Sequence, residues 1–86
     1  MVEILVFKSQ YCPNCQRLTP ILKELAEELK DKVKFREVDI SLERDIAVSH
    51  SILSVPAILI FKNGQKVKQL NGFIPKDKLI KELEAI

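Results

Sequence analysis

The first forty residues carry a pattern that few folds can accommodate. Val2 to Phe7 is almost wholly apolar and rich in branched side chains, as in a strand that is buried on both faces of a sheet. Apolar residues then recur at helical spacing from Pro13 to about Leu29, and charged residues occupy the opposite face. Val33 to Ile40 has the pattern of a second strand. Because a helix that joins two strands by short connections makes a right-handed crossover, we expect these strands to be parallel.

The middle of the chain predicts a second helix and a third strand. Residues 41–49 have a short helical pattern, and Asp39 or Ser41 is placed to cap its first turn. Ala57 to Phe61 is an apolar run of strand length. We therefore expect the chain to return to the sheet after a short helix.

A hairpin and a last helix complete the pattern. Asn63-Gly64 is a strong hairpin signal because both positions of its turn take positive φ, so Gln65 to Leu70 is expected to pair back as a fourth strand. Pro75 to Ala85 predicts the closing helix. The order β-α-β-α-β-β-α predicts an α/β fold, with a four-stranded mixed sheet covered by helices on both faces.

Length and charge restrict the class of protein. Eighty-six residues suit one domain spanning residues 1–86, which can bury a modest core without several disulfides. The net charge is only +2, lysines alternate with glutamates, and the four Phe and one Tyr are scattered. Nucleic acid is therefore not an expected partner, because nucleic-acid-binding proteins carry basic patches and aromatic platforms.

No segment predicts secretion or a membrane span. The N-terminal apolar run contains Glu3 and Lys8, and it lacks a basic leader and a small-residue cleavage site. No stretch approaches the ~20 apolar residues of a membrane-spanning helix. We therefore expect a cytoplasmic protein. We also expect it to be a monomer. In that compartment a close pair of cysteines is more often catalytic or metal-binding than structural.

The motif that carries chemistry is Cys12-Pro13-Asn14-Cys15, at the junction of the first strand and the first helix. Cys12 is expected at or beside the helix N-cap, where unpaired N–H groups and the helix dipole stabilise a thiolate. The thiolate is the form that attacks disulfides, and Lys8 or Arg17 can add to the positive field. Cysteines at this spacing can close a disulfide ring. The motif predicts that Cys12 attacks a substrate disulfide and that Cys15 resolves the mixed disulfide.

The same cysteine spacing supplies half of many zinc sites. The other half is missing here, because the chain has no further cysteine and His50 is its only histidine. One chain therefore predicts no metal site and no other cofactor, whereas a dimer that shares four cysteines remains an alternative. We expect His50 to lie at the end of the second helix in a solvated or capping role.

Four features in the right order resemble the thioredoxin and glutaredoxin superfamily over almost the whole chain. They are the cysteine motif, Pro20 in the first helix, the segment VPAILIFKNGQ from Val55 to Gln65, and the later Leu70-Asn71-Gly72. The resemblance implies a thioredoxin fold and a cis peptide bond before Pro56. It also implies that this proline loop packs beside the cysteine pair.

The resemblance further implies a substrate-binding surface around the cysteines. In the family the backbone of the residue before the cis-proline, here Val55, pairs with an extended substrate segment. Gly72 is similar to the family glycine that lets the substrate lie against the protein, although it can equally be a turn residue. Tyr11 can contact a partner or pack on the end of the strand. We expect the substrate surface to comprise Tyr11, Pro13, Asn14, Val55, Pro56 and Gly72.

Other positions depart from the patterns of this superfamily. Val6 stands where thioredoxins carry a buried aspartate, and the chain has no tryptophan before the motif. The proton of Cys15 then passes to water, with Glu37 as a weaker candidate acceptor. Phe73-Ile74 replaces the acidic pair with which glutaredoxins hold glutathione. The chain is most similar to the short, glutaredoxin-sized thioredoxin-like proteins of archaea and some bacteria.

Together these inferences predict an enzyme of the electron-carrier type, a dithiol/disulfide oxidoreductase that reduces protein disulfides. We expect a flavin-dependent disulfide reductase or a low-molecular-weight thiol to recharge it. The alternatives within the redox class are a glutathione-linked glutaredoxin and a disulfide isomerase. The alternative of another class is a metal- or cluster-binding module formed by the cysteine pairs of a dimer.

Overall fold

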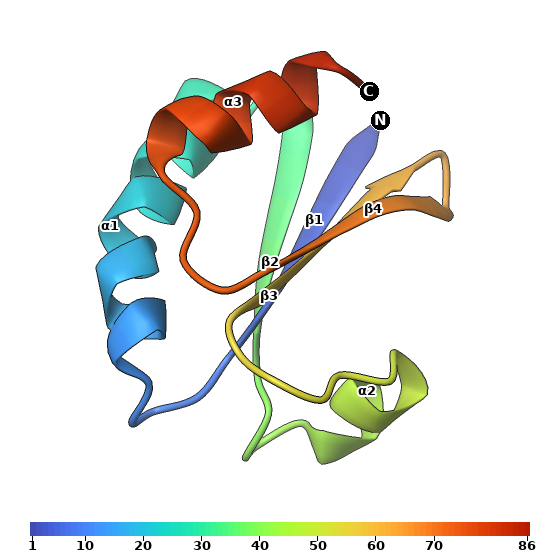
Figure 1. Ribbon diagram of the computed structural model, residues 1–86. Helices are drawn as coiled ribbons and strands as arrows, with labels where there is room; N and C mark the ends of the chain where they lie inside the picture. Colours follow the sequence, from blue (N-terminus) through green and yellow to red (C-terminus); the bar gives the residue numbers. More distant parts are fainter.

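A computed structural model describes residues 1–86 and confirms the predicted order of elements (Figure 1). The elements are β1 (Val2–Lys8), α1 (Pro13–Glu28), β2 (Val33–Asp39), α2 (Arg44–Ser49), β3 (Ala57–Lys62), β4 (Gln65–Asn71) and α3 (Lys76–Glu84). The strand order in the sheet is β2-β1-β3-β4. Strand β1 pairs in parallel with β2 and antiparallel with β3, and β3 pairs antiparallel with β4. The predicted mixed sheet and the parallel crossover are thereby confirmed.

Two apolar clusters pack on opposite faces of this sheet, because successive side chains of a strand point to opposite sides. The cluster beneath α1 and α3 consists of Ile4, Val6, Leu18, Leu22, Leu25, Val33, Ile58, Ile60, Ile74 and Leu79. The cluster beneath α2 consists of Phe7, Val38, Ala47, Ala57 and Leu59. Figure 1 shows α1 and α3 together on one side, with α2 apart from them. Helices therefore cover both faces, as predicted.

Ion pairs on the surface join α3 to its neighbours. The Lys76 ammonium donates to Glu24 at 2.8 Å and to Glu28 at 2.9 Å, both on α1. The hydrogen bond to Glu24, followed by that to Glu28, raises the pKa of Lys76. Lys68 of β4 forms an ion pair with Glu82 of α3. The Lys76 pairs are solvent-accessible, whereas Glu82 is mostly buried. Because exposed ion pairs contribute little, the apolar clusters supply most of the stability.

The second helix begins later than the sequence pattern predicts. It starts at Arg44, and its N-cap, Glu43, makes no side-chain capping hydrogen bond. The Asp39 carboxylate instead accepts hydrogen bonds from the main-chain N–H of Ser41 at 2.9 Å and from its hydroxyl at 2.5 Å. The predicted cap by Asp39 or Ser41 is therefore wrong, because these two residues bond to each other in the turn before the helix.

The hairpin forms as predicted, with φ values of 53° at Asn63 and 82° at Gly64. The last helix is shorter than predicted, because Pro75 lies outside it as an N-cap in an extended conformation. His50 is the C-cap of α2, but its ring is half-buried between those of Phe7 and Phe61, at centroid distances of 5.7 and 5.8 Å. The expected position at the end of this helix and the capping alternative are therefore confirmed, and the solvated alternative is wrong. No helix has both the length and the apolar character required to cross a membrane.

Candidate active site

The two cysteines lie at the start of α1, where the chain leaves the sheet. Cys12 is the N-cap residue in an extended conformation, and Pro13 occupies the first helical turn. Proline suits this position because its fixed φ fits a helix and its missing N–H has no intrahelical partner there. Cys12 and Cys15 form a disulfide, with their Cα atoms 5.1 Å apart. The local helix start thus holds both sulfurs within bonding distance.

The electrostatic environment of the Cys12 sulfur favours negative charge. Its Sγ accepts a hydrogen bond from the main-chain N–H of Cys15 at 3.1 Å. The first turn of α1 contains no acidic residue to oppose the positive end of the helix dipole. When the disulfide is reduced, the same N–H and the same dipole stabilise a thiolate at Cys12.

The two cysteines differ in accessibility. Cys15 lies inside the first turn and is only 5% exposed, among the buried residues of the core. Cys12 is only half-buried, so part of its side chain is accessible to solvent. The sulfur of Cys12 is therefore the one that a large partner can approach.

A second segment of the chain lies against Cys12. The peptide bond between Val55 and Pro56 is cis, and the carbonyl oxygen of Val55 lies 3.8 Å from Cys12 Sγ. The Pro56 carbonyl accepts a hydrogen bond from the N–H of Gly72 at 2.9 Å. Gly72 has a φ of 84°, which a residue with a side chain rarely adopts, so its turn requires glycine. Three distant segments thus meet at the cysteine pair.

The remaining residues expected at the site are exposed. Tyr11 is 87% exposed, so the alternative in which it packs on the end of the strand is wrong. Pro13 and Asn14 are also exposed, and the Asn14 side chain accepts a hydrogen bond from Arg17 at 3.3 Å. The residues on either side of Cys12 in the chain, an aromatic residue and two motif residues, are therefore open to solvent.

Sequence reasoning missed one conspicuous residue beside this site. Leu53 is 98% exposed and lies two positions before Val55, which contacts Cys12. A single exposed leucine is common on protein surfaces, but its place in the loop that reaches Cys12 makes Leu53 a candidate contact residue. The signal in the sequence was a leucine between Ser51 and Ser54, in a loop with no helical or strand pattern.

The two cations expected to act on the cysteines differ in their surroundings. Lys8 forms an ion pair with Glu37 at 2.5 Å, which offsets its charge. Glu37, the candidate proton acceptor, is the register partner of the buried Val6 and therefore shares the sheet face of α1. Arg17 has no carboxylate partner and lies with its guanidinium carbon 4.2 Å from the centroid of the Phe73 ring. Arg17 is thus the cation near the motif whose charge is not offset.

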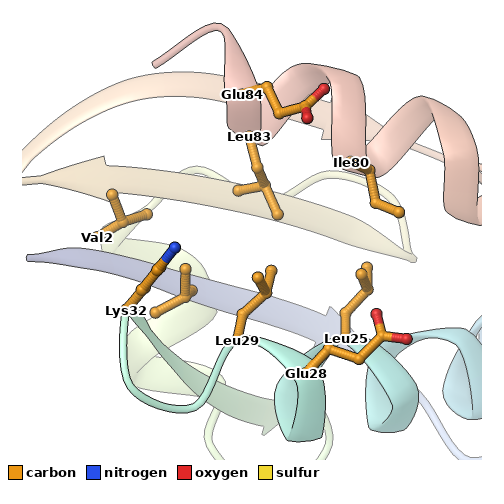
Figure 2. Close-up of a pocket in the computed structure, with 9 residues that line it drawn as sticks. Val2, Leu25, Glu28, Leu29, Lys32, Ile80, Leu83 and Glu84 are labelled. Atoms are coloured by element: carbon orange, nitrogen blue, oxygen red, sulfur yellow. The ribbon is translucent and has the colours of Figure 1, made fainter.

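No three His, Cys, Asp or Glu side chains come together in a way that could hold a metal ion. A cavity of about 420 Å³ lies between α1 and α3, and Figure 2 shows Leu25 and Leu29 facing Ile80 and Leu83 across it. This cavity is at the C-terminal end of α1, and Cys12 is at the other end. The 16 residues of α1 separate these ends by about 24 Å, so the cavity is not part of the cysteine site.

A vicinal cysteine pair at a helix start, with one sulfur accessible and the other buried, defines the active site of a dithiol/disulfide oxidoreductase. Comparison with known proteins agrees: the family model described as Thioredoxin matches residues 2–85. This chain belongs to the thioredoxin family.

Individual relatives extend over most of the chain. Thioredoxin C-2 of Corynebacterium nephridii is 40% identical over 73 residues, which cover 85% of this chain and 68% of the relative. Thioredoxin of Staphylococcus aureus is 30% identical over 83 residues, covering 96% of this chain and 80% of the relative. The chain is accordingly an enzyme of the thiol-disulfide oxidoreductase class. Thioredoxins in general act on protein disulfides and receive electrons from a reductase.

Proposed function

We propose that this chain is a thioredoxin-like reductant of protein disulfides, with Cys12 as the nucleophile and Cys15 as the resolving cysteine. The observation that supports these roles is the difference between the two sulfurs. Cys12 is half-buried and receives the Cys15 N–H hydrogen bond, whereas Cys15 is 5% exposed. A protein disulfide can therefore reach Cys12 but not Cys15. Cys12 is also the cysteine whose thiolate would accept a hydrogen bond from a main-chain N–H.

The reaction has two exchange steps. The Cys12 thiolate attacks one sulfur of the substrate disulfide, and the other substrate sulfur leaves as a thiolate that takes up a proton. Cys15, after losing its proton, attacks Cys12 Sγ; this closes the intramolecular disulfide and releases the second substrate sulfur, which is protonated in turn. The protein dithiol loses two electrons and two protons, and the substrate disulfide gains them.

Substrate binding is proposed to use main-chain and apolar contacts around Cys12. An extended substrate segment would lie along Val55, whose carbonyl is 3.8 Å from Cys12 Sγ, and pass beside Pro56 and Gly72. The exposed Tyr11 and Leu53 would contact apolar side chains of that segment, with Pro13 and Asn14 at its border. Such contacts tolerate many sequences, which suits a general reductant.

We further propose that residues 1–86 act as a single domain and as a monomer in the cytoplasm. A flavin-dependent disulfide reductase or a low-molecular-weight thiol would return Cys12 and Cys15 to the dithiol form. The family membership supports the reductase, and the replacement of an acidic pair by Phe73-Ile74 argues against glutathione.

The proposed function is tested by mixing the pre-reduced protein with a disulfide-bonded test protein and counting the substrate thiols that appear. We expect two thiols for each protein molecule oxidised, and sustained turnover with a flavin reductase and its nicotinamide donor. Turnover with glutathione alone would assign the glutaredoxin alternative. Failure of the reduced protein to reduce the test protein, together with ready oxidation of a dithiol substrate by the disulfide form of the protein, would contradict the proposed direction.

A further inference from the structure

Arg17 is held beside the cysteine pair by two contacts. Its Nη1 donates to the side-chain oxygen of Asn14 at 3.3 Å, and Asn14 lies between the two cysteines in the chain. Its guanidinium carbon lies 4.2 Å from the centroid of the Phe73 ring, and Phe73 follows Gly72 in the loop that bonds to Pro56. The cation therefore bridges the helix start and the glycine loop, which are the two segments that flank Cys12.

The charge of Arg17 has no partner within the chain. No carboxylate oxygen forms a salt bridge with it, in contrast to Lys8, which pairs with Glu37. The first turn of α1 has no acidic residue. A guanidinium has five N–H donors, and one of them is used, for Asn14. Arg17 is exposed, so its remaining donors can reach a partner while the guanidinium stays over the Phe73 ring.

This arrangement matches what a carboxylate requires. A planar guanidinium that is already held in place binds a carboxylate through parallel N–H bonds without first losing the mobility of a free arginine. Arg17 contacts Phe73, whose neighbour Gly72 bonds to Pro56 in the loop that lies against Cys12, so such a carboxylate would belong to the molecule whose sulfur is reacting at Cys12.

We propose that Arg17 is a specificity-determining residue that binds a carboxylate of the disulfide substrate next to the reacting sulfur. The inference rests on the proposed function and goes beyond it, since it assigns a preference among substrates. The carboxylate can come from an acidic side chain near a half-cystine of a protein, or from a small carboxylated disulfide. In both cases the order of preference is acidic, then neutral, then basic.

The test uses three peptide disulfides that differ only in a Glu, Gln or Lys beside one half-cystine. Pre-reduced protein is mixed with each peptide, and the second-order rate of a single turnover is measured by acid quench and alkylation. We expect the Glu peptide to react about two- to fivefold faster than the Gln peptide, and the Lys peptide to react more slowly by a similar factor. About 1 M salt should remove the differences, because the Debye length falls to about 3 Å.

Variants separate charge recognition from a purely structural role of Arg17. Arg17→Gln should react with all three peptides at nearly one rate. Arg17→Lys keeps the positive charge, so it should still react fastest with the Glu peptide, but with smaller differences between the peptides. Lys23→Gln is the matched control, because it removes the same charge from an exposed position of α1. Lys23 is six residues further along the helix, about 9 Å, and beyond the screening distance at physiological salt. It should keep the wild-type order.

Small disulfides distinguish the two sources of the carboxylate. N-acetylcysteine disulfide is compared with its amide, under the same conditions. A faster reaction of the acid than of the amide, lost in Arg17→Gln, would assign the site to small carboxylated disulfides as well; a preference confined to peptides would assign it to protein substrates.

If wild type reduces all peptides at one rate, or if Arg17→Gln keeps the wild-type order, the inference is wrong and the proposed function stands. If wild type reduces none, both fail.

Discussion

The main-chain N–H of Cys15 donates a hydrogen bond to the Sγ atom of Cys12, 3.1 Å away. One residue of the pair thus stabilises the sulfur of the other, and the relationship is not reciprocal, because Cys12 donates no hydrogen bond to Cys15 Sγ. Cys15 is also inside the first turn and only 5% exposed. The asymmetry gives the two cysteines different tasks although they are only three residues apart.

The first prediction concerns these tasks. Cys12→Ser is expected to abolish exchange, because the accessible nucleophile is gone. Cys15→Ser is expected to leave Cys12 reactive but unable to release its substrate, so that mixed disulfides accumulate. Both variants are incubated with a disulfide-bonded test protein, and covalent complexes are counted by non-reducing electrophoresis and mass spectrometry. Equal trapping by the two variants would contradict the assignment of roles.

The second prediction concerns the apolar edge of the site. Leu53→Ser is expected to lower kcat/KM for protein disulfides about threefold to tenfold, the effect of losing part of one leucine's burial in the complex. The thermal midpoint should not change, because Leu53 is 98% exposed in the free protein. Val67→Ser, on β4 and 49% exposed, is the control. Equal losses of kcat/KM in both variants would show that Leu53 has no special role.

A third prediction follows from the turn before α2. The hydroxyl and then the N–H of Ser41 lower the pKa of Asp39, so ionised Asp39 stabilises the fold above its unfolded pKa of about 3.9. This contribution is lost as the pH falls through the lower pKa of the folded state. Asp39→Asn should therefore unfold at a lower urea concentration than wild type at pH 7, and the difference should shrink below about pH 4. A difference that persists unchanged at pH 2 would refute the linkage.

The fourth prediction tests the packing that holds the helix start against the sheet. Leu18 is one turn beyond Cys15 and 1% exposed. Leu18→Ala is expected to reduce the free energy of unfolding by about 2–5 kcal/mol, because it removes buried methyl groups and leaves a cavity. Val67→Ala should cost less than about 1 kcal/mol in the same urea titration. A loss below about 1 kcal/mol in Leu18→Ala would show that this contact is not required.

Much of the fold could be predicted because its signals are local. The spacing of apolar residues in α1 and the positive φ values needed at Asn63 and Gly64 depend on neighbouring residues only. The cysteine pair belongs to the same class, since a helix start places Cys12 and Cys15 together without help from the rest of the chain. The sheet order is not local, but it follows from the order of the elements, because a strand, a helix and a strand with short connections make a right-handed parallel crossover.

The incorrect or missing features have two causes: one local choice that the pattern does not resolve, and contacts between residues far apart in the chain. The start of α2 was misplaced because Asp39 and Ser41 bond to each other in the preceding turn, an option as local as a cap and indistinguishable from it by pattern. The ring of His50 is half-buried because Phe7 and Phe61 flank it, which only the sheet register determines. The contact of Arg17 with Phe73 likewise exists only after the glycine loop has returned to α1.

One measurement tests the central claim most directly. The purified protein is equilibrated with thiol/disulfide buffers of graded potential, and the oxidation of Cys12 and Cys15 is followed by alkylation and mass spectrometry. A thioredoxin-like reductant predicts a reversible two-electron transition near the ~−270 mV of thioredoxin. A transition near about −180 to −120 mV would contradict the reductant and indicate isomerase or oxidant chemistry. If no intramolecular disulfide forms at any potential, the exchange mechanism itself is wrong.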